Sequence, residues 1–426
     1  MKTPSNSLLN PFLSRFLSTL QNEPPKIVAN VSFALSFSFL LLILSSCALA
    51  PPSPVRPNID HLFIDAQFKP SSVSINADEV FALSDEMKRF IRIEMARQIK
   101  EKGTQAGLFD ALYSEKQLKL FYDAERTRNA AETFDTRSGN CLSLVIMTGA
   151  FAKELGLRVH YQRVLVDESW TRNSGIFFAS GHVNLVLGTT FYLSNNPVES
   201  TQTMTIDFSP PAQTQWHRNE AISEQTIIAM YMNNRAAEAL VRGQIDDAYW
   251  LAREAIKQDA SFLSAYNTLG VIYRHHANTD AAEQVFNTLL ALDHKNLQAM
   301  SNLALLLREQ ARFEEANLIL ARLEQAQPFA PYYFFDQGQN AFQRGDYEAA
   351  KSFFQREVKR DQYNHEFQFW LAVSYFKLGE MSQAKKHLNK AMESSTTRKE
   401  HDLYAAKLDR LTSESMPQKL RQTTQQ

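Results

Sequence analysis

The stretch 263-LSAYNTLGVIYRHHANTDAAEQVFNTLLALDHKN-296 carries two apolar stripes, each with the spacing of an α-helix. The first stripe consists of Tyr266, Leu269, Gly270 and Tyr273. The second consists of Ala282, Phe286 and Leu289. Because an α-helix completes a turn in 3.6 residues, side chains three or four positions apart share one face. The stretch therefore predicts two helices that pack against each other through a short turn.

The same pattern recurs every 34 residues through the C-terminal half of the chain. A small residue stands at Ala248, Ala282, Ala316, Ala350 and Ala384. Five positions earlier stands a turn residue, at Gly243, Ala277, Ala311, Gly345 and Gly379. A period kept over five units without insertion indicates a stack of helix pairs, in which small residues allow close helix crossings.

The period and the helix-turn-helix pattern resemble the tetratricopeptide repeat, and Pro328 lies where that repeat usually ends a helix. The five expected units are 229–262, 263–296, 297–330, 331–364 and 365–398. The first is the weakest, with Arg235 where a core leucine is usual. Residues 399–415 are expected to form a capping helix through Leu403, Leu408 and Leu411, followed by a disordered tail at 416–426.

A stack of this kind forms an all-α superhelix whose concave face accepts a protein or peptide segment. The sequence does not identify that partner. The aromatic run from Tyr332 to Phe335 either fills the helix core, which is the more ordinary role, or lines the binding groove.

A second pattern with chemical meaning lies upstream of the repeats, between residues 134 and 166. A loop is followed by a predicted helix from about Cys141 to Leu155, with Gly156 at its C-terminal end and a strand after it. Unpaired N–H groups and the helix dipole at a helix N-terminus stabilise a thiolate, the nucleophilic form of cysteine. Cys141 is therefore a candidate nucleophile.

Two later segments alternate as strands do. In 181-GHVNLVLG-188 the valine and leucines point to one face, while His182 and Asn184 point to the other. In 205-TIDFSP-210, Asp207 lies opposite its apolar neighbours. If the two strands are adjacent, His182 and Asp207 share one side of the sheet, and Cys141 at the tip of its helix completes a nucleophile–base–orienter set.

The loop Arg137-Ser138-Gly139-Asn140-Cys141 and the order Cys, His, Asp resemble the transglutaminase-like superfamily. The resemblance covers about residues 118–210 and implies a papain-like α+β domain at 60–218. It also implies that Cys141 is the nucleophile, His182 the general base and acid, and Asp207 the residue that orients His182. Asn184 and Gln162 are weaker candidates for positioning substrate.

The N-terminus resembles a bacterial lipoprotein signal. An apolar run from Val31 to Leu44 is followed by Ser45-Ser46-Cys47, and lipid attachment at Cys47 is the expectation. Residues 1–46 are then a signal peptide, or alternatively an uncleaved single-pass anchor. The proline-rich residues 47–59 are expected to tether the chain to a membrane of the cell envelope, facing the periplasm.

Composition narrows the function classes. With 45 basic and 46 acidic residues the net charge is −1, so no global field attracts nucleic acid. Two cysteines exclude a disulfide framework, and no Cys/His cluster or glycine-rich phosphate loop predicts a metal or cofactor. Two functions remain open: a cysteine-dependent amide hydrolase or acyl transferase served by the repeats, and a non-enzymatic scaffold that assembles envelope proteins.

Overall fold

A computed structural model describes residues 59–113, 118, 120–124, 126–173, 176–193, 196–208, 218–329 and 331–414. The predicted signal or anchor at 1–46, Cys47, the tether up to residue 58 and the tail at 416–426 lie outside the described residues. Within the described residues, no helix combines the length and apolarity that a membrane span requires.

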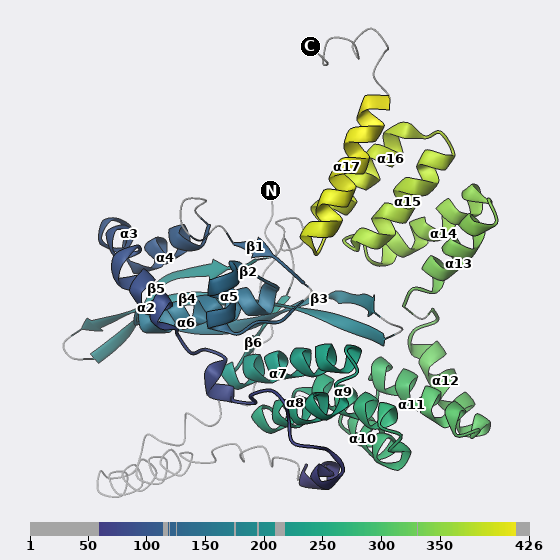
Figure 1. The fold of residues 1–426 in the computed structure, drawn as a ribbon, viewed down its shortest axis with the longest axis horizontal. Helices are drawn as coiled ribbons and strands as arrows, with labels where there is room; N and C mark the ends of the chain where they lie inside the picture. Colours follow the sequence, from purple (N-terminus) through teal and green to yellow (C-terminus); the bar gives the residue numbers. More distant parts are fainter. Residues whose placement is uncertain are drawn as a thin grey trace, which may run out of the picture. The chain divides into compact units, whose positions relative to one another are not determined.

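The N-terminal part of the described chain is α+β (Figure 1). Three short 3-10 turns, η1 to η3, precede the first regular helix, which begins after its cap Ser84. The elements that follow are α2 (Asp85–Ile93), α3 (Ala96–Lys102), α4 (Thr104–Tyr113), β1 (Phe121–Tyr122), α5 (Ala130–Thr136), β2 (Ser138–Gly139), α6 (Cys141–Glu154), β3 (Arg158–Asn173), β4 (Ile176–Leu193), β5 (Asn196–Ile206) and β6 (Arg218–Ile222).

The four longer strands form one antiparallel sheet in the order β5-β4-β3-β6, and β1 pairs in parallel with β2. Helix α6 packs on the sheet, as Val183, Leu185 and Leu187 of β4 are fully buried. The approach is close at Gly149 of α6, where an added Cβ would lie 2.5 Å from the hydroxyl of Tyr161. The predicted helix and the predicted inward face of β4 are confirmed.

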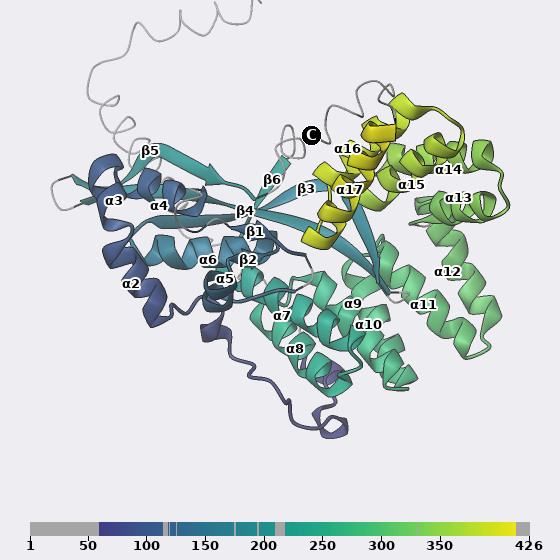
Figure 2. The same cartoon turned by 45° about the horizontal axis from the view of Figure 1, so that its top comes forward.

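The C-terminal part is an array of antiparallel helix pairs (Figures 1 and 2). Its helices are α7 (Glu224–Val241), α8 (Ile245–Gln258), α9 (Leu263–His275), α10 (Thr279–Leu292), α11 (Leu297–Glu309), α12 (Phe313–Ala326), α13 (Tyr333–Gln343), α14 (Tyr347–Arg360), α15 (His365–Lys377), α16 (Met381–Glu393) and α17 (Arg398–Glu414). The five predicted turn residues all adopt positive φ, between 60° and 80°. Each pair therefore turns at the position that the period indicates.

Close crossings hold each pair together. The five alanines of the repeat are all fully buried. In the second pair, an added Cβ at Gly270 would lie 2.5 Å from the ring of Phe286, and Gly338 approaches Phe354 in the same way at 2.6 Å. In the aromatic run, Tyr332, Phe334 and Phe335 are buried and only Tyr333 is exposed, so most of it is core.

Helix α17 caps the array, but with a different residue in contact from the one expected. Leu403 is 49% exposed, whereas Tyr404 is buried. Tyr404, Leu408 and Leu411 pack against the last pair because they follow one another at i, i+4 and i+7. The expectation for Leu403 is wrong by one position.

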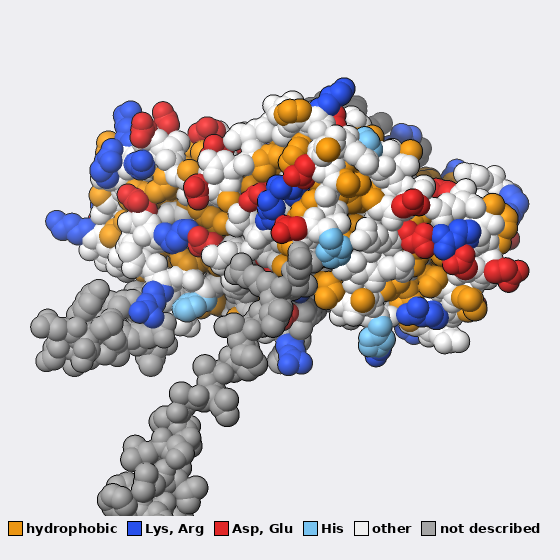
Figure 3. Space-filling model, turned by 90° about the horizontal axis from the view of Figure 1, so that it is seen from below, with side chains coloured by type: hydrophobic (Ala, Val, Ile, Leu, Met, Phe, Trp, Pro, Cys, Tyr) orange, Lys and Arg blue, Asp and Glu red, His pale blue; other side chains and the backbone are white. Residues whose placement is uncertain are grey.

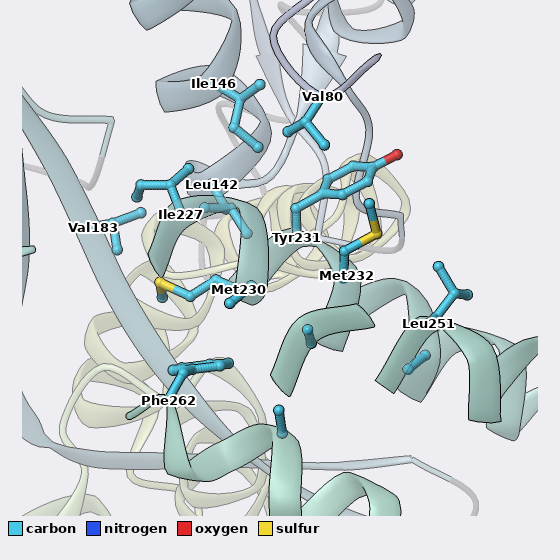
Figure 4. Packing of buried hydrophobic residues seen from close by; sticks show 14 of the residues in the cluster. Val80, Leu142, Ile146, Val183, Ile227, Met230, Tyr231, Met232, Leu251 and Phe262 are labelled. Carbon is cyan, nitrogen blue, oxygen red and sulfur yellow. The ribbon is translucent and has the colours of Figure 1, made fainter. Parts of the chain in front are cut away.

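The two parts of the chain share a core rather than meeting across a linker. One cluster of buried side chains runs from the sheet domain into the first three helix pairs. Figure 4 shows Ile227 and Met230 of α7 beside Leu142 of α6 and Val183 of β4. Arg235 stands where this repeat usually has a core leucine, and its side chain contacts the sheet domain. Its guanidinium donates to the hydroxyl of Tyr231 and lies 3.7 Å from the Glu132 carboxylate of α5.

An N-terminal strap, residues 59–76, lies along the first two helix pairs. Phe68 stacks on Tyr249 of α8 with ring centroids 3.8 Å apart, and the Tyr273 hydroxyl donates to the Leu62 carbonyl. Asp65 accepts from Tyr249 and pairs with Arg253 at 2.9 Å. Nothing in the sequence pattern pointed to this contact. On the face shown in Figure 3, basic and acidic side chains are interspersed, as the balanced net charge leads one to expect.

Candidate active site

Cys141 is the first residue of α6, and close contacts fix the loop before it. Asn140 caps the helix, with its side-chain oxygen accepting from the N–H of Ser143 at 2.9 Å, while its amide donates to Thr127. At Gly139 an added Cβ would lie 2.6 Å from Ser143, so a larger residue does not fit there. Cys141 is a free, half-buried thiol.

His182 and Asp207 form the second part of the site. The His182 Nε2 atom lies 2.7 Å from Asp207 Oδ1. Asn184 donates to the other carboxylate oxygen at 3.1 Å, and the Tyr113 hydroxyl donates to the Asp207 backbone carbonyl at 3.0 Å. The carboxylate is thus fixed by partners on both oxygens, and the imidazole is fixed by the carboxylate.

His182 interacts with Cys141 as well as with Asp207. Burial lowers the pKa of His182, but hydrogen bonds with Asp207 and Cys141, together with the charges of both residues, outweigh burial and raise that pKa to about 10. His182 is consequently an imidazolium at neutral pH. Cys141, His182 and Asp207, predicted from three separate segments, are in contact in the fold.

The two weaker site predictions concern Asn184 and Gln162. Asn184 is 3% exposed, and its amide donates to Asp207. The prediction that Asn184 positions substrate stays a prediction; what the structure gives for its side chain is the bond to Asp207. Gln162 lies opposite Asn184 on β3, is partly exposed, and accepts from the Asn219 side chain at 3.1 Å. Its role stays a prediction.

Residues 120–124 and 126–129 run beside the site, although no sequence motif predicts it. Tyr122 lies on β1, whose pairing with β2 brings it to the loop before Cys141. Farther along the segment, Thr127 N donates to Glu238 of α7 at 2.7 Å, and Ala124 N donates to the Thr396 carbonyl at 3.0 Å, just before α17. The segment has neither helical nor strand periodicity, and its place follows only from long-range pairing.

No group of three or more His, Cys, Asp or Glu side chains in the described part of the chain is arranged to hold a metal. The absence of a cofactor stays a prediction.

Known proteins resemble the helix pairs. A family model described as "Tetratricopeptide repeat" matches residues 341–406. The C-terminal helices form a tetratricopeptide-repeat (TPR) superhelix. Such superhelices bind protein partners along their surface. The match begins near the end of α13 and ends within α17, so it spans the last helices of the array and part of the cap.

Several solved structures are similar to part of the chain. A thermophilic TPR protein of Thermus thermophilus is 19% identical, with a TM-score of 0.26, covering 42% of this chain and 97% of that one. The pilF protein of Pseudomonas aeruginosa is 20% identical, with a TM-score of 0.25, covering 48% and 99%. MamA of Desulfovibrio magneticus is 17% identical, with a TM-score of 0.24, covering 42% and 99%. No curated protein matches the chain.

Proposed function

We propose that this protein is a cysteine-dependent amide hydrolase or acyl transferase of transglutaminase-like type, acting on a protein or peptide that its TPR array recruits. The observation that carries the proposal is the contact among a helix N-terminal thiol, an imidazolium and a fixed carboxylate. These groups supply a nucleophile, a proton carrier and an orienting group within one site. Titratable groups that shift one another's pKa are concentrated at functional sites. Here three such groups come from separate segments of the chain.

The reaction follows from that geometry. The proton of the Cys141 thiol passes to His182, and the resulting thiolate attacks the carbonyl carbon of an amide, while the electron pair of the C=O double bond moves to the oxygen. His182 then gives its proton to the leaving amine, so that the C–N bond breaks and a thioester remains. Water or an amine attacks the thioester, and His182 takes up the proton that the attacking group loses. Water completes a hydrolysis, and an amine completes a transfer.

Asp207 and Asn184 act through His182. The Asn184 amide occupies Asp207 Oδ2 and leaves Oδ1 directed at the imidazole. The carboxylate in turn favours the charged imidazolium that the free site holds. In this proposal Asn184 is a positioning residue for Asp207.

Recruitment and location complete the proposal. The first TPR helix pair is continuous with the core that holds α6, so a segment bound to the array is held close to the thiol-bearing domain. Residues 1–46 would export the chain, and lipid on Cys47 would anchor it to a membrane of the cell envelope, facing the periplasm. A retained single-pass anchor would give the same location.

The test is the reactivity of the thiol. Because a Cys47→Ala variant leaves Cys141 as the remaining cysteine, iodoacetamide labelling of this variant reports on one site. We expect alkylation at mildly acidic pH to be faster than that of glutathione, and His182→Gln to slow it. His160→Gln is the matched control, because His160 lies exposed on the neighbouring strand β3. Labelling no faster than glutathione would refute the enzyme proposal.

The second candidate function is a non-enzymatic scaffold, and the TPR array is the observation that favours it. In that case Cys141→Ala and wild-type protein capture the same envelope partner in equal amounts, and no partner is cleaved or acylated by either. A product formed by the wild type and absent with Cys141→Ala rules the scaffold function out.

A further inference from the structure

The first TPR helix, α7, holds helix α5 and the residues just before it. Glu238 of α7 accepts a hydrogen bond from the backbone N–H of Thr127, with the nitrogen 2.7 Å from Oε1. Arg235, also on α7, lies 3.7 Å from the carboxylate of Glu132, which forms the capping box at the start of α5 with Asn129. The connection from Thr127 to α5 is therefore fixed by a carboxylate and a guanidinium that the array supplies.

The same connection is bonded to the first turn of α6, the helix that carries the thiol. The Asn140 amide donates to the Thr127 hydroxyl at 2.9 Å. The Arg128 N–H donates to the Ser143 hydroxyl at 2.9 Å, and that hydroxyl donates to Asn140 Oδ1 at 2.9 Å. Thr127 and Ser143 are both buried. These hydrogen bonds form a closed ring that fixes Asn140, the residue directly before Cys141.

The reactivity of Cys141 depends on the first turn of its helix. The unpaired N–H groups and the dipole at a helix N-terminus favour the thiolate over the thiol. A fixed cap keeps those N–H groups in helical geometry, whereas loss of a cap destabilises the end of the helix. Because Asn140 adjoins Cys141, a displaced cap also moves the sulfur.

The repeat itself gives no reason for a carboxylate at Glu238. A carboxylate that leaves water costs free energy unless hydrogen bonds and opposite charges offset the loss. The Glu238 side chain is 18% exposed, and its second oxygen lies 3.8 Å from Arg235 and 4.0 Å from Arg242. Burial raises the pKa of Glu238, and the bond from Thr127 together with the two arginines opposes that rise. The group that Glu238 serves is therefore Thr127, which lies outside the array.

We propose that Glu238 is a positioning residue for the nucleophile: through Thr127 and Asn140 it fixes the first turn of α6. This inference rests on the proposed acyl-transfer function. It gives the first TPR helix a role besides recruitment, because the loop that presents Cys141 is complete only when α7 is packed against it. The array then sets the reactivity of the thiol as well as the choice of partner.

The experiment measures iodoacetamide alkylation of Cys141 from mildly acidic to alkaline pH in the full chain carrying Cys47→Ala. Glu238→Ala removes the acceptor of the Thr127 N–H, whereas Glu238→Gln keeps an oxygen at that place. We expect Glu238→Ala to slow alkylation at mildly acidic pH about 10-fold, which corresponds to a rise of about one unit in the pKa of the thiol. At alkaline pH, where the thiol is ionised in either protein, the two rates should be equal. Glu238→Gln should keep the wild-type rate throughout.

Thr127→Val tests the same chain of hydrogen bonds without a change in the array. It keeps the backbone N–H that donates to Glu238 and removes the hydroxyl that accepts from Asn140. It should shift the pH profile of alkylation as Glu238→Ala does. The double variant should react no more slowly than either single variant, because both changes release the same cap. Losses that multiply in the double variant would overturn the inference, since the two residues would then act separately.

Glu324→Ala is the matched control, because it removes a carboxylate from an exposed position on α12, in another part of the array. It should leave the alkylation rate unchanged at every pH. A wild-type rate for Glu238→Ala at mildly acidic pH would overturn the inference. Equal slowing at acidic and alkaline pH would also overturn it, since the change would then block access to the sulfur. If Glu238→Ala does not fold, Thr127→Val decides: a shifted profile supports the inference, and a wild-type profile overturns it.

Failure of the proposed function gives a different result. In that case wild-type Cys141 reacts no faster than glutathione at mildly acidic pH, before any change at Glu238 or Thr127 is made.

Discussion

The turns between paired TPR helices predict a gain in stability from glycine. All five turn residues have positive φ, yet two of them are alanines, Ala277 at 62° and Ala311 at 60°. An L-residue with a Cβ loses roughly 1–2 kcal/mol in this conformation compared with glycine. Glycine also makes the unfolded chain more flexible, which returns about 0.4–1 kcal/mol of that difference.

The net expectation is a stabilisation of roughly 0.5–1 kcal/mol for each substitution, obtained as the difference of those two terms. The turn hydrogen bonds survive because they use the backbone alone: Ala277 N donates to Arg274 O at 3.1 Å, and Asn278 N donates to Tyr273 O at 2.8 Å. The two sites lie in different repeats, so the Ala277→Gly and Ala311→Gly effects should add to about 1–2 kcal/mol.

The assay is urea unfolding of the full chain, followed by the helical circular dichroism signal. The double variant should unfold at a higher urea concentration with an unchanged slope, which marks a change in stability rather than in exposed surface. Ala321→Gly is the control, because Ala321 lies exposed in the middle of α12, where glycine costs about 0.5–1 kcal/mol. A double variant no more stable than wild type, with Ala321→Gly destabilised as expected, would refute the reasoning.

Three further predictions concern packing and charge. Gly270→Ala places a Cβ against Phe286 and should lower the free energy of unfolding by about 1–3 kcal/mol; an unchanged urea midpoint would contradict the close crossing. Phe68→Ala removes a buried ring stacked on Tyr249 and should cost about 3–5 kcal/mol and speed proteolysis of the strap; unchanged proteolysis would contradict the packing. The pKa of His182 rises from 6.5 to about 10 on folding. The protonated His182 therefore adds its full contribution to the free energy of unfolding below pH 6.5, and this contribution is lost as pH rises through 10. The difference in free energy of unfolding between wild type and His182→Gln should therefore narrow over that pH range in urea titrations. A difference that widens would contradict the stabilisation of the charged His182 by its neighbours.

Much of the array could be read from the sequence because each TPR unit is local. The period of 34 residues, the buried alanines and the turn positions follow from helix geometry within one pair. The amphipathic pattern predicts the capping helix, but Tyr404 rather than Leu403 makes its buried contact. Which face of a terminal helix is covered depends on its neighbour, and a single amphipathic stretch does not fix that rotation.

The candidate site was predictable in its parts. Cys141 at a helix N-terminus and His182 on an alternating strand are local signals, and the structure brings both together with Asp207. The bond from Asn184 to Asp207 could not be predicted, because alternation gives the side of a strand but not the neighbour on that side. Whether the group performs catalysis stays a prediction.

The sequence by itself determined the repeat, its turns and the three candidate site residues, since all of these depend on spacing along one helix or strand. Only the tertiary structure decided that β1 pairs with the loop before Cys141, that the strap packs on α8 and α9, and that the first TPR helix is part of the sheet domain's core. Those contacts join residues far apart in the chain. Their partners are selected by the shape and packing of whole elements, which no local period encodes.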